Sequence, residues 1–154
     1  MTKLIRSNSE SQTREVAQQI AQRLQKGAIL FLEGDLGAGK TVFSKGVAEG
    51  LGVEATEVKS PTFVLMHQYD GKLPIYHFDL CRLDSEDQLD DMDTGYFLYG
   101  NGVCLVEWAD RIKRDKPKEF LEVLIKHLGD HTREIELIAH GDRYQRIVEK
   151  VDLK

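Results

Sequence analysis

Hydrophobic residues recur every four positions near the start of the chain, at Val16, Ile20 and Leu24. This spacing places them on one buried face of a helix. Ser9 followed by Gln12 has the spacing of a capping box at a helix N-terminus. The pattern therefore predicts a helix that begins after Ser9 and ends at Gly27, preceded by a strand around residues 4–5.

Short apolar runs alternate with turn signals along the rest of the chain. They predict strands at residues 28–33, 63–69, 75–80, 102–108, 120–128 and 133–140, and helices at residues 42–51 and 142–151. Asp70-Gly71 and Gly129-Asp130 separate successive alternating runs and indicate two hairpin turns. The 102–108 run is apolar almost to its end, which is typical of a buried parallel strand.

One motif lies between the strand at 28–33 and the helix at 42–51. Residues 34–41 read Gly-Asp-Leu-Gly-Ala-Gly-Lys-Thr, which fits the phosphate-binding loop pattern G-x-x-x-x-G-K-[ST] at every fixed position. Backbone N–H groups of such a loop point at phosphate oxygens, and the following helix adds the partial positive charge of its N-terminus. The nucleotide-binding residues that the motif predicts are Asp35, Leu36, Gly37, Ala38, Gly39, Lys40 and Thr41.

The last two residues of the motif indicate a nucleoside triphosphate rather than any anion. Lys40 is expected to bridge the β- and γ-phosphates as a point charge and to assist catalysis, and the Thr41 hydroxyl is expected to ligate Mg²⁺. The order of elements around the loop predicts a single-domain α/β fold of the P-loop NTPase-like type over residues 1–154. We expect a mostly parallel central sheet flanked by helices, with antiparallel hairpin additions.

Composition and charge indicate the class of protein and its location in the cell. Hydrophobic residues make up 41% and charged residues 31% of the 154 residues, which is ordinary for a globular domain. No apolar stretch approaches a membrane span and the polar N-terminus shows no signal-peptide pattern, so we expect a cytoplasmic protein. Cys81 and Cys104 are far apart, without metal-ligand spacing, and are expected to be buried free thiols. The net charge of −5 and the scattered Lys and Arg residues indicate that a partner, rather than this chain, holds any RNA.

Phosphoryl transfer also needs an acid that anchors the metal ion. Glu107 follows the four apolar residues 103–106 and so ends a predicted buried strand. Ligands of open α/β sheets bind at that edge. We therefore expect Glu107 to hold Mg²⁺ directly or through water; the alternative is that it ends the strand at the surface.

Asp79 is the candidate for orienting an attacking water or holding a water bound to the metal ion. Strand alternation places it on the same face as His77. The alternative is a structural carboxylate bonded to backbone N–H groups. We interpret His77 as a hydrogen-bonded strand histidine. We interpret Trp108 as a core residue; the alternative is a contact with the nucleotide. The Ser-Pro-Thr segment at 60–62 fits a switch loop and a plain turn equally well.

Four segments together resemble the TsaE (YjeE) family in order and spacing: GDLGAGKT at 34–41, VKSPTF at 58–63, HFDL at 77–80 followed by Arg82, and LVEW at 105–108. That family comprises small bacterial P-loop ATPases required for threonylcarbamoyladenosine formation on tRNA. The resemblance covers nearly the whole chain. Two departures are visible, since Val42 stands where the family often has a second Thr and Cys81 where it usually has Tyr.

The resemblance implies a protein that binds ATP and Mg²⁺, hydrolyses ATP slowly alone and serves as the ATPase accessory of TsaB and TsaD. Contact with tRNA would be indirect, through these partners. By motif position Lys40 would bind phosphate and Asp79 would be needed for hydrolysis. Mg²⁺ would be placed by Thr41 and Glu107. The resemblance also implies that two regions approach the nucleotide: the N-terminal segment around Glu10–Thr13, and Arg133 near the final hairpin.

Two other classes of protein use related loops. Small-molecule kinases usually show an Arg-rich lid, and Arg111 and Arg114 are the only close arginine pair near the candidate site. Guanine-nucleotide switches carry N-K-x-D and D-x-x-G motifs, and the sequence contains neither. A partner-dependent ATPase of tRNA modification is therefore the favoured interpretation.

Overall fold

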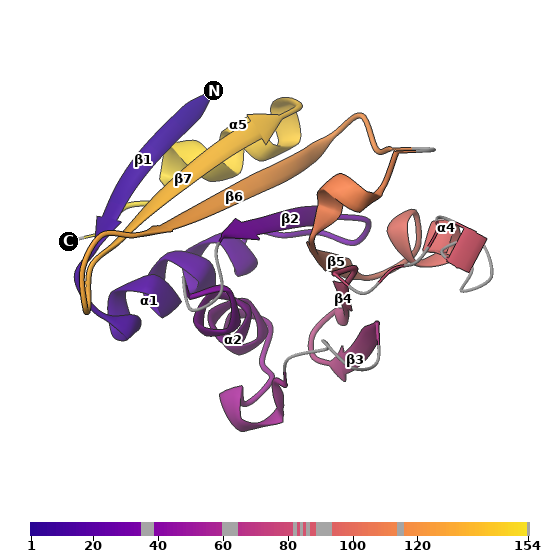
Figure 1. Cartoon of the computed structure of the whole chain (residues 1–154), viewed down its shortest axis with the longest axis horizontal. Helices are drawn as coiled ribbons and strands as arrows, with labels where there is room; N and C mark the ends of the chain where they lie inside the picture. Colours follow the sequence, from indigo (N-terminus) through magenta and orange to yellow (C-terminus); the bar gives the residue numbers. More distant parts are fainter. Residues whose placement is uncertain are drawn as a thin grey trace.

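A mixed sheet forms the centre of the fold. The computed structural model describes residues 1–34, 39–59, 65–81, 83, 85, 87–88, 94–113 and 116–153. Figure 1 shows the seven described strands of the sheet, in the order β1-β7-β6-β2-β5-β4-β3. The strands are β1 (Thr2–Ser7), β2 (Ile29–Gly34), β3 (Met66–Asp70), β4 (Pro74–Asp79), β5 (Val103–Glu107), β6 (Phe120–His127) and β7 (Arg133–His140). The helices are α1 (Glu10–Ala21), α2 (Lys40–Gly50), α4 (Thr94–Leu98) and α5 (Asp142–Lys150), with 3₁₀ turns at Ala55–Glu57 and Ala109–Arg111.

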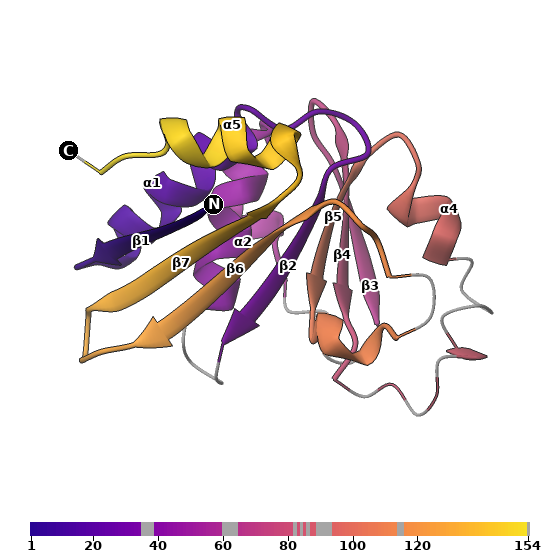
Figure 2. The ribbon, with the colours of Figure 1, turned by 90° about the horizontal axis from the view of Figure 1, so that it is seen from above.

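The four central strands are parallel. β2 pairs with β5 on one side and β6 on the other, and β5 pairs with β4. Figure 2 shows the arrowheads of these strands at the same edge of the sheet. The hairpins β3–β4 and β6–β7 are antiparallel, and β1 adds antiparallel to β7. The predicted parallel centre with antiparallel hairpin additions is therefore confirmed.

Each face of the sheet has its own apolar core. Side chains of β2 alternate between them, because Leu30 and Leu32 join the cluster that includes the buried residues of α1, α2 and α5. Ile29 and Phe31 join the opposite cluster, to which α4 contributes Leu98. The three longer helices thus cover one face. In the described part of the chain no helix is long and apolar enough to cross a membrane.

Helices α1 and α2 lie side by side (Figure 1) and approach closely through small residues. A Cβ placed on Gly46 would lie 2.6 Å from the Cβ of Ala17 and from the carbonyl oxygen of Arg14. A Cβ on Gly50 would lie 2.6 Å from the Cβ of Ala21. The absence of side chains at these two glycines therefore fixes how α2 packs on α1.

An ion pair also joins the two helices. The Arg14 guanidinium contacts both carboxylate oxygens of Glu49, with its Nε donating to Oε1 at 2.7 Å. This hydrogen bond from Arg14 lowers the pKa of Glu49. The pair is partly exposed, so it orients the helices more than it stabilises them.

The first helix is shorter than its hydrophobic spacing predicts. It ends at Ala21 rather than at Gly27. The next turn is tighter, because Arg23 N–H donates to the Ile20 carbonyl at 3.0 Å and Leu24 N–H to the Ala21 carbonyl at 3.1 Å. Leu24 is still buried, so its side chain follows the helical spacing although its backbone has left the helix.

The strand predicted at 63–69 is also shifted. Leu65 has a φ of 53°, in the left-handed region, and β3 begins only at Met66. A residue with positive φ interrupts the extended backbone that a strand needs. Residues 60–64, which include the Ser-Pro-Thr segment, lie outside the described part of the chain.

The close helix contact generates a stability prediction. Gly46→Ala gains about 1 kcal/mol of helix propensity, but its methyl group meets Ala17 and the Arg14 backbone at 2.6 Å. Overpacking of this kind costs about 1–3 kcal/mol, so we expect a lower Tm in thermal unfolding. Gly95→Ala is the matched control, because a Cβ there meets nothing within 4 Å. Equal Tm values for the two variants would contradict the close approach.

Candidate functional site

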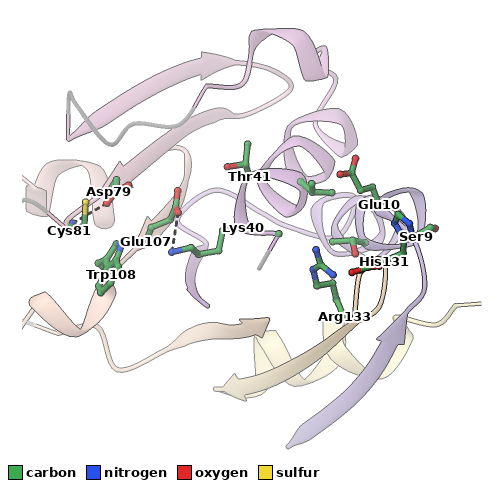
Figure 3. Close-up of a pocket in the computed structure, with 14 residues that line it drawn as sticks. Ser9, Glu10, Lys40, Thr41, Asp79, Cys81, Glu107, Trp108, His131 and Arg133 are labelled. Carbon is green, nitrogen blue, oxygen red and sulfur yellow. Dashed lines mark hydrogen bonds and ion pairs between the residues drawn. The ribbon is translucent and has the colours of Figure 1, made fainter. Parts of the chain in front are cut away.

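A pocket of about 360 Å³ opens where the start of α2 faces the ends of β4 and β5. Figure 3 shows Lys40 and Thr41 between two groups of side chains, with Asp79, Cys81, Glu107 and Trp108 on one side and Ser9, Glu10, His131 and Arg133 on the other. The complete lining is Ser9, Glu10, Thr13, Gly39, Lys40, Thr41, Val42, Asp79, Cys81, Glu107, Trp108, Asp130, His131 and Arg133. Most of the predicted site residues therefore meet in one cavity.

The end of the phosphate-binding loop is described from Gly39 onward. Gly39 has a φ of 112° and caps α2, whose first residue is Lys40. This backbone conformation strains any residue with a side chain, which accounts for glycine at this position. Asp35, Leu36, Gly37 and Ala38 lie outside the described residues, and their role in nucleotide binding stays a prediction.

Glu107 is buried at the carboxyl end of β5. Glu107 is 5% exposed, so the alternative that it ends the strand at the surface is wrong. Its Oε1 lies 3.7 Å from the Lys40 Nζ. The predicted position of the acid at the end of a buried parallel strand is confirmed, and that position brings the acid opposite the lysine of the loop.

Asp79 stands beside Glu107, because the two residues are register partners on β4 and β5. It is 4% exposed and lines the pocket. Its Oδ1 accepts a hydrogen bond from the Cys81 N–H at 3.0 Å. Asp79 therefore makes the hydrogen bond to a backbone N–H that a structural carboxylate was expected to make, and its side chain also faces the cavity.

His77 is hydrogen-bonded within the sheet, as interpreted from the sequence. Its Nε2 lies 2.7 Å from Oε2 of Glu107. Its Nδ1 lies 3.4 Å from the hydroxyl of Tyr69. Burial raises the pKa of Tyr69, and the negative charge of Glu107 adds to that rise.

The interpretation of Trp108 as a core residue is wrong. Its side chain is 41% exposed and lines the pocket, with the Lys40 Nζ 5.1 Å from the centre of its ring. Trp108 follows the last residue of β5 and has a φ of 60°. This left-handed turn interrupts the strand alternation, so the indole leaves the core and reaches the phosphate-loop lysine.

The opposite side of the pocket combines the start of α1 with the β6–β7 turn. Ser9 caps α1 by accepting a hydrogen bond from the Gln12 N–H at 3.1 Å, and Glu10 follows as the first helical residue. Arg133 donates through Nη1 to the carbonyl oxygens of Gly129 and Thr132, at 3.0 and 3.1 Å. Glu10 and Arg133 thus reach the same cavity as Lys40.

Several lining residues were not predicted, namely Ser9, Val42, Cys81, Trp108, Asp130 and His131. Asp130 and His131 belong to the turn between two predicted strands, but no local pattern tells which end of the sheet such a turn occupies. The parallel pairing of β6 with β2 places the end of β6, and with it the turn, at the edge of the sheet where the phosphate-binding loop begins. That pairing joins segments far apart in the sequence.

The oxygen donors suit one kind of metal ion. No group of three or more His, Cys, Asp or Glu side chains capable of holding a metal occurs among the described residues. Mg²⁺ in nucleotide sites is held by one or two protein oxygens together with phosphates and waters. Thr41 and Glu107, with Asp79 beside them, fit that kind of incomplete shell.

A strand followed by a left-handed glycine, a lysine opening the next helix and an acid on the neighbouring parallel strand define an α/β protein of the phosphate-binding-loop class. The family described as "Threonylcarbamoyl adenosine biosynthesis protein TsaE" matches residues 7–135, and the chain belongs to this TsaE family. The resemblance inferred from the four sequence motifs is therefore confirmed.

Known proteins support the assignment along most of the chain. The chain is 45% identical over 147 residues to the tRNA threonylcarbamoyladenosine biosynthesis protein TsaE of Bacillus subtilis, covering 95% of this chain and 91% of that protein. It is 38% identical over 129 residues to the protein of the same name from Treponema pallidum, covering 84% and 95%. The crystal structure of Bacillus subtilis YdiB matches with a TM-score of 0.80 and 39% identity, covering 98% of this chain and 94% of that one.

The two cysteines provide a test of the pocket. Cys104 is fully buried, as expected, and burial raises its pKa to about 12. The expectation that Cys81 is also buried is wrong, because Cys81 lies beyond the end of β4, where it lines the pocket and is partly exposed. Because the thiolate is the reactive form, we expect a maleimide at pH 7.5 to label one thiol of the folded chain and two after unfolding. Cys81→Ser should abolish the native labelling, counted by mass spectrometry. Labelling of Cys104 in the folded chain would contradict the described burial.

Proposed function

We propose that this chain is a Mg²⁺-dependent ATPase that supports threonylcarbamoyladenosine modification of tRNA as the accessory of TsaB and TsaD. The observation that carries the proposal is the pair of Lys40 and Glu107, 3.7 Å apart across a pocket built on a phosphate-binding loop. The Lys40 ammonium, which would bind the phosphates, thus lies opposite the Glu107 carboxylate, which would bind the metal ion. Membership of the TsaE family supports the tRNA pathway.

Nucleotide binding would follow from the groups around Lys40. The ammonium of Lys40 would contact the β- and γ-phosphates, and the start of α2 would present backbone N–H groups and a partial positive charge to them. Arg133 and Glu10 line the other side of the pocket and would lie against the nucleotide there. Residues 35–39 of the motif would supply the rest of the phosphate cradle.

The metal ion would be held between α2 and β5. The Thr41 hydroxyl and the Glu107 carboxylate line the pocket and are the protein oxygens that would hold Mg²⁺. When bound, Mg²⁺ neutralises charge that develops on the transferred phosphoryl group. The burial of Glu107 strengthens its interaction with a cation, because water screens the charges less there.

Asp79 would position the attacking water. Its carboxylate lies beside Glu107 at the end of the adjacent strand, and the hydrogen bond from the Cys81 N–H holds one oxygen in place. The carboxylate would accept a hydrogen bond from the water and so orient the lone pair of the water oxygen toward the γ-phosphate. Orientation of water is the protein's main task in this kind of hydrolysis.

Partners explain why hydrolysis would be slow without them. An arginine supplied in trans raises phosphoryl-transfer rates by about 10³- to 10⁵-fold in related enzymes, so the isolated chain would turn over slowly. The net charge of −5 favours indirect contact with tRNA. We propose that TsaB and TsaD hold the tRNA, and that the three proteins act in the cytoplasm.

The proposal predicts a specific loss on removing the Lys40 ammonium. A hydrogen bond to a charged group contributes about 1.5–3 kcal/mol, so Lys40→Ala should weaken Mg²⁺–ATP binding by about 10- to 100-fold. Trp108 is the single tryptophan of the chain and lies next to Lys40, and its fluorescence reports binding in the native chain. Calorimetry measures the variants independently of the indole.

Lys45→Ala is the matched control, because Lys45 lies on the same helix but does not line the pocket. It should bind Mg²⁺–ATP like the native chain. Equal binding by Lys40→Ala and Lys45→Ala would refute the proposed phosphate site. Phosphate transfer from ATP to a small-molecule acceptor would instead favour the kinase alternative.

A further inference from the structure

A row of buried polar side chains lies behind the pocket. Tyr69, His77 and Glu107 come from β3, β4 and β5, and they are 7%, 1% and 5% exposed. His77 joins the other two, with Nε2 2.7 Å from Glu107 and Nδ1 3.4 Å from the Tyr69 hydroxyl. The row connects the pocket to the interior of the sheet.

The two oxygens of Glu107 have different surroundings. Oε2 lies 2.7 Å from the His77 Nε2, whereas Oε1 lies 3.7 Å from the Lys40 Nζ. A carboxylate only accepts hydrogen bonds, so the His77 nitrogen must be the donor. One oxygen is thereby anchored in the sheet and the other is turned toward the phosphate-loop lysine.

Tyr69 anchors the far end of the row. Its hydroxyl accepts a hydrogen bond from the Lys59 N–H at 3.2 Å and donates to the Lys59 carbonyl at 3.0 Å. Both backbone groups of one residue thus hold the phenol. The Tyr69 hydroxyl in turn lies 3.4 Å from the His77 Nδ1, so each of the two ring nitrogens of His77 has a polar neighbour.

From this arrangement we propose that His77 is a positioning residue that orients Glu107 toward the bound Mg²⁺. The inference rests on the proposed Mg²⁺–ATP site. His77 does not line the pocket, so its role is to position Glu107 and not to contact the nucleotide. It acts by holding Oε2, so that Oε1 keeps the direction in which a metal ion beside Lys40 and Thr41 would meet it. Mutation of a residue that orients a metal-binding side chain typically costs about 10- to 100-fold in metal affinity or activity.

The variants separate orientation from folding. His77→Leu keeps a side chain of similar size and removes the donor, whereas His77→Gln retains an amide N–H that can reach Glu107. Tyr69→Phe removes only the hydroxyl that contacts His77 and Lys59. His67→Leu is the matched control, because His67 is the register partner of His77 on β3 and does not line the pocket.

The readout is metal binding rather than turnover. Mn²⁺ replaces Mg²⁺, a non-hydrolysable ATP analogue occupies the nucleotide site, and electron paramagnetic resonance measures free Mn²⁺. We expect His77→Leu to raise the Mn²⁺ concentration at half-saturation by about 10- to 100-fold. His77→Gln should restore most of the affinity, His67→Leu should match the native chain, and Tyr69→Phe should give a smaller shift in the same direction. In the His77→Leu background, Tyr69→Phe should not weaken Mn²⁺ binding any further.

The outcomes distinguish this inference from the proposed function. A folded His77→Leu variant with native Mn²⁺ affinity would overturn the positioning role and leave His77 as a structural residue. If His77→Leu does not fold, as judged by its Tm without ligands, unchanged Mn²⁺ affinity in Tyr69→Phe would overturn it instead. Failure of the native chain to bind Mn²⁺ and the analogue would refute the Mg²⁺–ATP site itself.

Discussion

The burial of the Glu107 carboxylate is the constraint on which the site depends. A charge that is 5% exposed has lost most of its hydration, and such a loss is tolerated only when hydrogen bonds and an opposite charge replace water. His77 and Lys40 supply these contacts from an adjacent strand and from the phosphate-loop helix. The carboxylate therefore links the sheet to the loop, and every described buried side-chain nitrogen and oxygen has a partner.

The fold supplies the geometry for this link. Parallel pairing of β2, β4, β5 and β6 brings their carboxyl ends to one edge, and α2 begins at that edge. Close packing of Gly46 and Gly50 on α1 sets where α2 lies, and with it the ammonium of Lys40. The hairpin β6–β7 then carries Arg133 to the opposite side of the same pocket. Helix packing and strand register thus together determine the geometry of the pocket.

Local patterns in the sequence were sufficient for much of this arrangement. The loop motif located Lys40 and Thr41, and an apolar run ending in an acid located Glu107, because both signals lie within a few consecutive residues. The residue type led to the wrong interpretation of Trp108, because a left-handed turn after β5 exposes this aromatic side chain. His131 could not be found, since the β6–β7 turn reaches the pocket only through the parallel pairing of β6 with β2, which lies far away in the sequence. The contact of His77 with Glu107 likewise needed the register of β4 and β5.

ATP turnover by the purified chain, alone and with the TsaB–TsaD pair, tests the account most directly. Asp79→Asn serves as the comparison, because its side-chain oxygen can still accept the Cys81 N–H while the carboxylate charge is lost. The account predicts slow turnover that rises when the pair is added, with Asp79→Asn remaining at least about 10²-fold slower although it still binds ATP. No rise with the pair, or native turnover by Asp79→Asn, would contradict it.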